Sequence, residues 1–221
     1  HFPDRAFVFS SSAKWTNSSK LCRFGDVHRP PTNNRQPMNL AHRIKEILLN
    51  PKQAWPVIEA EQTDTPTLYI QYIMLLALVP TISVFVGNAI SHPEQFSLLG
   101  GIVRMVVDYL LWMATIYLVA LLADRLAPNF QGQRNPIAAL KLSAYSSTAG
   151  MLGGIFSAIP SPMLYGVPGL LAWGYSLYLL FTGVSIMMKS PMEKALPYSV
   201  ILFVGSLVAY AGLGMASLIL R

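Results

Sequence analysis

The chain has 221 residues, of which 53% are hydrophobic and only 12% are charged, and its mean hydropathy is +0.44. Soluble domains carry about twice that charged fraction, so the composition excludes an ordinary water-soluble domain. The net charge of +6 does not indicate a nucleic-acid-binding protein, because the cations are scattered and are not interleaved with aromatic residues on a polar domain. The single cysteine, Cys22, excludes an internal disulfide framework and a multi-cysteine metal site.

Residues 1–37 differ from the rest of the chain, because they are polar, rich in Ser, Asn and Arg, and without periodicity. They lack the apolar stretch of about 7–15 residues that a secretory signal requires. We interpret them as a non-native extension, with the natural product beginning at Met38. A disordered cytosolic tail is the alternative, and the intact mass of the native protein would distinguish the two.

Residues 38–66 are predicted to form a cytosolic amphipathic segment, in which a short helix follows the N-cap Asn39. Apolar residues at i, i+4, i+7 and i+8 would share one face of this helix: Leu40, Ile44, Ile47 and Leu48. Asn50-Pro51 ends it. The segment either lies on the membrane surface with Trp55 at headgroup level or packs on the cytosolic face of the protein itself, and the pattern leaves both open.

Five later stretches are apolar over roughly 20 residues each, which is long enough for a helix to cross a bilayer. Short polar turns with Pro, Gly and Asn separate them. We therefore predict an all-α, polytopic membrane helix bundle, with a five-span domain over residues 67–221. The predicted spans are residues 67–90, 97–122, 136–159, 163–188 and 198–220.

The positions of Lys and Arg predict the orientation of these spans. They gather before the first span, between the second and third, and between the fourth and fifth: Arg43, Lys45, Lys52, Arg125, Arg134, Lys141, Lys189 and Lys194. The turns 91–96 and 160–162 contain neither residue. Because cytoplasmic loops are enriched in Lys and Arg, we expect a cytoplasmic amino terminus and a periplasmic or external carboxyl terminus. Lys141, about one turn into the third span, is interpreted as a cytoplasmic anchor that snorkels.

Arg104 and Asp108 form the candidate intramembrane polar pair. Both lie well inside the second predicted span, and their i, i+4 spacing places them on one helix face. Inserting either charge alone would cost about 2.5–3.5 kcal/mol, so we expect mutual neutralisation or a wet cavity. The pair could serve an ion or proton pathway, or it could be structural, with Arg104 snorkelling toward the outer face.

Small residues recur at every fourth position in the third span and again in the fifth: Gly150, Gly154, Ala158, Gly205 and Ala209. Such stripes let helix backbones approach closely. They favour helix packing, either within one bundle or between two copies of the chain.

Motifs that would indicate catalysis are missing from the sequence: H-E-x-x-H, G-x-S-x-G and the P-loop do not occur, and the spans contain no His and no second buried carboxylate. The Ser and Thr residues of the spans have no base partner and are expected to bond to helix carbonyls. We predict a protein without catalytic residues, cofactor or metal. Its predicted partners are the lipid bilayer and either another membrane protein or a second copy of itself.

Several short motifs complete the pattern: Asn50-Pro51 with Trp55, the aromatic-led first span through Pro80, Ala138 to Lys141 with Ala144 to Ser146, and Gly174 to Gly183. The arrangement resembles the Yip (Ypt-interacting protein) family over roughly residues 38–221, and in particular its small bacterial inner-membrane members. The resemblance implies five helices, a cytosolic amino end and a location in the bacterial cytoplasmic membrane. Eukaryotic relatives act in vesicle traffic and contact Rab-type GTPases through longer amino-terminal regions, whereas this chain offers only residues 38–66.

These observations predict a non-enzymatic inner-membrane protein that organises the membrane or partner proteins. The alternative is a small transporter or channel that uses the Arg104/Asp108 pair.

Overall fold

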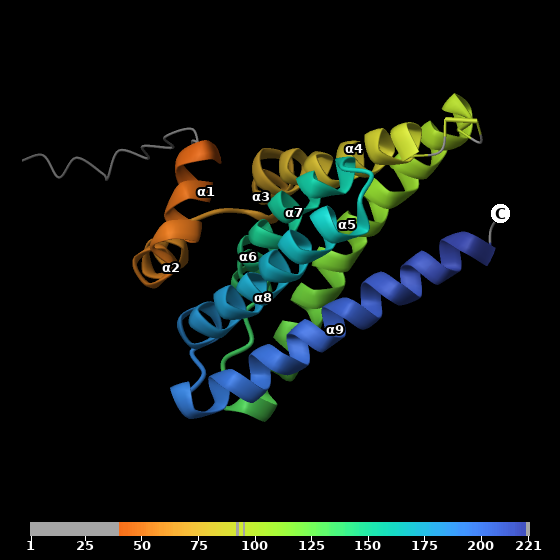
Figure 1. Ribbon diagram of the computed structural model, residues 1–221. Helices are drawn as coiled ribbons and strands as arrows, with labels where there is room; N and C mark the ends of the chain where they lie inside the picture. Colours follow the sequence, from red (N-terminus) through yellow and green to blue (C-terminus); the bar gives the residue numbers. More distant parts are fainter. Residues whose placement is uncertain (1–39, 92, 95, 220–221) are drawn as a thin grey trace, which may run out of the picture. The chain divides into compact units, whose positions relative to one another are not determined.

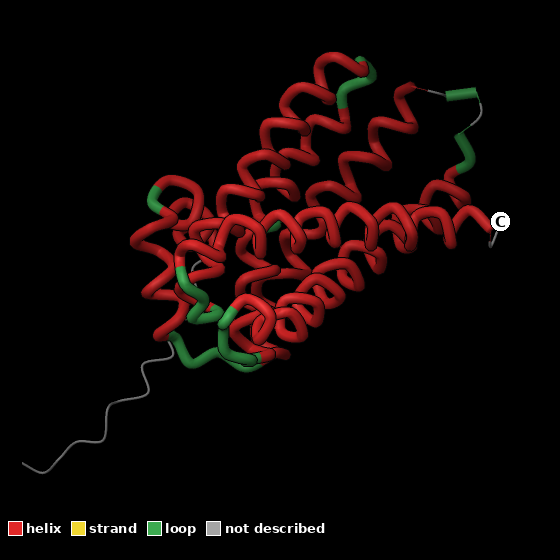
Figure 2. The backbone as a smooth tube through the Cα atoms, turned by 90° about the horizontal axis from the view of Figure 1, so that it is seen from below, coloured by secondary structure: helices red, strands yellow, loops and turns green. Residues whose placement is uncertain are grey.

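The computed structural model describes residues 40–91, 93–94 and 96–219 of the chain. Within these ranges every regular element is a helix, as the red segments of Figure 2 show, so the predicted all-α class is confirmed. The predictions for residues 1–37 and for the N-cap at Asn39 lie outside the described residues.

Two short helices come first, α1 (Leu40–Leu49) and α2 (Pro51–Ala60). Pro51 begins α2 at a position where its missing N–H costs no helix hydrogen bond. Trp55 of α2 is fully buried, and its indole Nε1 donates to Thr182 Oγ1 at 3.1 Å. Of the two alternatives for this segment, the structure therefore has α2 packed on the protein. The Trp55 ring enters the helix bundle and does not face outward.

Within the described ranges, four helices are long and apolar enough to cross a membrane: Thr65–Ser91, Leu98–Phe130, Met163–Met187 and Met192–Gly212. The first joins α3 (Thr65–Leu68), the π-helix η1 (Tyr69–Ile73) and α4 (Met74–Ser91). The second joins α5 (Leu98–Leu126) and the 3-10 helix η2 (Ala127–Phe130). The others belong to α8 (Pro162–Met187) and α9 (Met192–Ile219). Helix α9 begins before the predicted residue 198 and runs through Pro197, since a proline removes one hydrogen bond but keeps a helical φ.

The third predicted span is divided among three shorter elements: α6 (Pro136–Ser146), α7 (Thr148–Gly153) and the 3-10 helix η3 (Gly154–Ala158). A local break falls at Ser147. Hydroxyl groups at the break and directly before it donate to nearby carbonyls, Ser147 Oγ to Ala144 O at 3.0 Å and Ser146 Oγ to Ser143 O at 3.2 Å. Such back-bonding bends helices, and it corrects the expectation of one uninterrupted helix over residues 136–159.

Helix α6 is buried along most of its length and contacts both α5 and α8. Helix α9 packs on α5 and α8, and α4 packs on α5 and η3 (Figure 1). Two glycines allow the α4–η3 approach. A Cβ added to Gly87 would lie 2.1 Å from the Ser157 carbonyl oxygen, and one added to Gly154 would lie 2.6 Å from Pro80 Cβ.

The segments rich in Lys and Arg meet at one end of the bundle. Lys189, after α8, donates to Glu59 of α2 at 2.7 Å, and this hydrogen bond and charge hold the pKa of the Glu59 carboxyl below its usual value. The backbone N–H of Gln133 donates to the carbonyl of Met188 at 2.7 Å. Folding therefore brings together the regions that the charge pattern assigns to one side.

Candidate functional site

Arg104 and Asp108 lie one turn apart on α5 and form a loose ion pair. The distance from Arg104 Nε to Asp108 Oδ2 is 3.7 Å, and the side chains are 50% and 24% exposed. A charge-assisted hydrogen bond is shorter, about 2.7–2.9 Å. The contact therefore does not use up the N–H donors of the guanidinium group.

The pair lines a groove of about 1120 Å³ between α4, α5 and α9. Figure 1 shows α9 diverging from α4 and α5 toward the carboxyl end of the chain. Arg104 and Asp108 are the only charged side chains among the described residues that line the groove. The polar residues around them are Thr81, Asn88, Ser97 and Tyr210, and most of the remaining wall is apolar. The site thus combines one positive and one negative group with mostly apolar walls.

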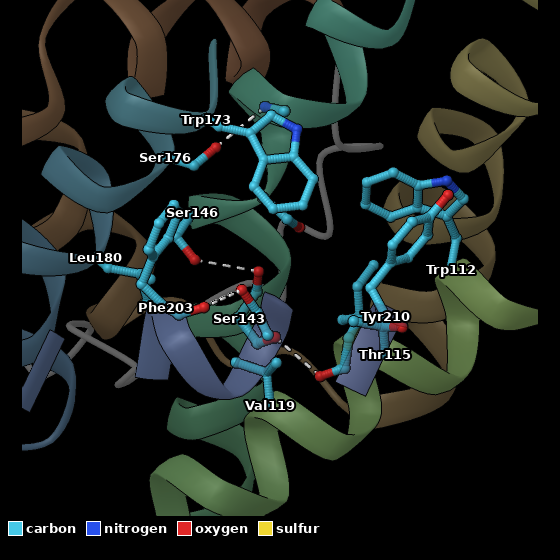
Figure 3. Close-up of a pocket in the computed structure, with 14 residues that line it drawn as sticks. Trp112, Thr115, Val119, Ser143, Ser146, Trp173, Ser176, Leu180, Phe203 and Tyr210 are labelled. Atoms are coloured by element: carbon cyan, nitrogen blue, oxygen red, sulfur yellow. Dashed lines mark hydrogen bonds between the residues drawn. The ribbon is translucent and has the colours of Figure 1, made fainter. Parts of the chain in front are cut away.

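A smaller cavity of about 60 Å³ adjoins the groove inside the bundle (Figure 3). Hydroxyl residues from five segments of the chain line it: Thr115, Ser143, Ser146, Ser147, Ser176 and Ser206. Ser143 Oγ donates to the Ile116 carbonyl at 2.8 Å, and Ser176 Oγ accepts from the Gly150 N–H at 3.0 Å. Thr115 Oγ1 is buried and has no hydrogen-bond partner among the described residues. Almost all of the surface that faces the cavity is nevertheless apolar, because several of these hydroxyls are turned toward backbone carbonyls. The cavity therefore offers few of the polar partners that a buried water needs.

Tyr210 of α9 lines both the groove and the cavity, so the two spaces are neighbours. The sequence shows hydroxyl residues in the spans but does not predict this cavity. Its walls come from α5, α6, α7, α8 and α9, and no spacing along one helix reveals such an assembly. The only sequence signal is the run of small polar residues around Ser147.

Lys141 does not snorkel along the membrane as predicted. Its side chain is buried, and its Nζ donates to the carbonyl oxygens of Ile58 at 2.8 Å and Glu61 at 2.5 Å. Both carbonyls belong to the carboxyl end of α2, where helix carbonyls lack partners and a cation is favourable. Arg43 of α1 bonds to Glu61 as well. Lys141 therefore joins α2 to α6. The sequence could not predict this contact, because the two helices are far apart along the chain.

The glycines of the predicted packing stripes meet atoms of the same chain. A Cβ added to Gly150 would lie 3.4 Å from Ser176 Oγ, and one added to Gly205 would lie 2.5 Å from Leu122 Cδ2. Gly154 contacts Pro80 as described above. Ala158 lies on η3 and Ala209 on α9. These contacts place the glycines at interfaces between helices of one bundle.

Among the described residues, no group of three or more His, Cys, Asp or Glu side chains is arranged to hold a metal ion. Several cavity hydroxyls bond to backbone groups, for example Ser206 Oγ to the Phe203 carbonyl at 2.6 Å. The groove can bind polar groups through hydrogen bonds and through the charges of Arg104 and Asp108.

Comparison with protein families gives one result that bears on this site. A family model described as the Yip1 domain matches residues 45–213. The match extends from α1 into α9 and includes all residues that line the cavity and all that line the groove except Gly214 and Met215. Comparisons with curated proteins and with solved structures give no match.

Proposed function

We propose that this chain, which belongs to the Yip1-domain family, is a non-enzymatic inner-membrane protein that organises lipids or partner proteins. The observation that carries this proposal is the groove containing Arg104 and Asp108. The groove lies between helices that are long enough to cross a membrane. Its charged pair can therefore make a polar contact with a molecule of the bilayer. The family match and the four apolar helices identify a multi-pass membrane protein.

A phospholipid is the occupant that the groove suits best. Ligand pockets commonly have volumes of about 300–1,000 Å³ and apolar walls with a few polar groups, and the groove has that character at a slightly larger size. An acyl chain would lie along the apolar wall, and the headgroup would meet Arg104. In this way the protein would hold lipid at a defined place on its surface.

The proposal includes five membrane crossings, with the third formed by α6, α7 and η3 together. These elements have 11, 6 and 5 residues, and at helical rises they extend about 35 Å. The hydrocarbon core is about 30 Å thick. An odd number of crossings, with the basic segments cytoplasmic, puts the amino terminus in the cytoplasm and the carboxyl terminus outside.

Lipid retention tests the organising role. The full chain is purified in mild detergent, and phospholipid phosphorus is measured per mole of protein for the wild type, Arg104→Gln and Arg125→Gln. Arg125 is an exposed residue at the far end of α5 and outside the groove, so its variant is the matched control. We expect less retained phospholipid only in Arg104→Gln. Equal retention in all three proteins would contradict the proposal.

A transporter or channel is the second candidate, and the Arg104/Asp108 pair in a groove between membrane-length helices favours it. Proton and ion flux into proteoliposomes is measured for the wild type, Asp108→Asn and Arg104→Gln, with circular dichroism as the folding control. This function requires flux in the wild type and its loss in both variants. Absence of flux in a folded wild type, or unchanged flux in the variants, would exclude it.

A further inference from the structure

We propose that the groove between α4, α5 and α9 binds one phospholipid with a phosphoethanolamine headgroup, its phosphate on Arg104 and its ammonium on Asp108. This inference rests on the proposed function and names the lipid class that the groove selects.

The charges of the groove match a zwitterion. Its described lining residues contribute one guanidinium and one carboxylate, so their charges sum to zero. A phosphoethanolamine headgroup carries one phosphate charge and one ammonium charge, and each would meet its opposite. A purely anionic headgroup would satisfy Arg104 but would leave Asp108 beside a like charge, and unfavourable contacts of that kind exclude wrong ligands.

The loose geometry of the pair leaves room for both contacts. At 3.7 Å, the Arg104 Nε to Asp108 Oδ2 approach is an ion pair without a short hydrogen bond. The remaining guanidinium N–H groups can donate to phosphate oxygens, for which arginine has a suitable planar geometry. Asp108 has further interactions within the bundle, but a carboxylate has about four acceptor sites and can also accept from an ammonium group.

The position of the pair along α5 corresponds to the headgroup region. Helix α5 has 29 residues and extends about 44 Å, so it exceeds the hydrocarbon thickness of about 30 Å by about 7 Å at each end if it is centred. Arg104 lies about 9 Å from the beginning of the helix at Leu98. Arg104 therefore lies near the boundary between headgroups and acyl chains. Asp108 begins one turn deeper, about 15 Å from Leu98, and its side chain leans toward Arg104 because side chains lean toward the amino end of a helix.

Apolar side chains lie close to the pair, where the acyl chains of the lipid would begin. Phe85 of α4 and Phe96 pack edge to face, with ring centroids 5.3 Å apart, and they form one end of the wall. Val107 and Leu111, on the turns of α5 after Arg104 and therefore deeper in the bilayer, also line the groove. These residues would contact acyl chains, while the charged pair would select the headgroup.

Native mass spectrometry of the full chain, with lipids of matched acyl composition, tests the selectivity. The competing lipids are phosphatidylethanolamine, anionic phosphatidylglycerol, and phosphatidylcholine, whose quaternary nitrogen has no N–H to donate. Because hydrogen bonds to charged groups are strong, we expect the wild type to prefer phosphatidylethanolamine by about tenfold or more over each competitor. Arg125→Gln should keep this ranking.

The two groove variants should fail in different ways. Asp108→Asn leaves the groove with one positive charge, so the preference for phosphatidylethanolamine over phosphatidylglycerol should disappear or reverse. Arg104→Gln should lose retention of all three lipids, because each of them carries a phosphate. Equal retention of the three lipids by the wild type would overturn the phosphoethanolamine site and leave the lipid-organising function standing. If either variant does not fold, the wild-type ranking decides by itself, and binding that does not depend on Arg104 would overturn both proposals.

Discussion

At Gly183 of α8, the lack of a side chain is what lets Trp55 enter the bundle. A Cβ at this position would lie 2.5 Å from two atoms of the Trp55 ring and 2.8 Å from Leu142 Cδ1. The neighbouring Thr182 accepts the indole hydrogen bond. Gly183 therefore permits a close approach between α8 and the Trp55 ring, and this contact determines where α2 packs on the bundle. The sequence analysis singled out the regularly spaced glycines of the third span, whereas Gly183 belongs to no such stripe.

We expect Gly183→Ala to destabilise the protein by about 1–3 kcal/mol, since overpacking a close contact forces side chains or backbone to shift. Thermal unfolding followed by tryptophan fluorescence measures the change. Gly174→Ala is the control on the same helix, because an added Cβ there meets no atom within 4 Å. That variant should be neutral or slightly stabilising. Equal losses in both variants would show that the Trp55 contact is not the cause.

At the scale of elements, α2 is held by contacts with two other parts of the chain. Lys141 of α6 binds the carbonyls at its carboxyl end, and Lys189, after α8, binds Glu59 on its exposed side. The first contact is buried, while the second joins side chains that are 48% and 38% exposed. Exposed ion pairs contribute little to stability. The attachment of α2 therefore depends mainly on Lys141 and on the burial of Trp55.

Replacing Lys141 with methionine should loosen α2 while most of the bundle stays folded. The substitution keeps the aliphatic length but leaves the Ile58 and Glu61 carbonyls without their charged donor, at a cost of about 1–3 kcal/mol. Hydrogen exchange of residues 51–61 should become faster, with residues 162–187 unchanged. Lys52→Met, at an exposed position on α2, is the control. Unaltered exchange in Lys141→Met would show that the capping contact does not hold the helix.

At the scale of the whole molecule, the number of membrane crossings depends on one segment. Residues 136–158 are divided at Ser147 and again at Gly154, so they do not form one long membrane helix. Residues 138–151, which include the break at Ser147, nevertheless run through the buried part of the bundle, where other helices of the chain cover most of their polar groups. Irregular backbone is tolerated at membrane depth under that condition. A divided third crossing is therefore physically acceptable.

Cysteine labelling on either side of this segment tests the crossing. In a Cys22→Ala background, cysteines are introduced singly as Gln133→Cys and Ser161→Cys, and intact cells are treated with a membrane-impermeant maleimide. Five crossings predict labelling from outside at position 161 and protection at position 133. Labelling of permeabilised cells controls for reactivity. Equal protection at both positions in intact cells would mean that residues 136–158 do not cross the membrane.

The sequence by itself determined the helical class, the apolar helices and the shared face of Arg104 and Asp108. These features depend on hydropathy and on spacing within one helix, which can be read along the chain. The tertiary structure decided the burial of Trp55, the attachment of Lys141 to α2, and the cavity around Thr115. Each of these depends on partners from other elements, and burial makes such contacts necessary because a polar group removed from water must find a partner inside the protein.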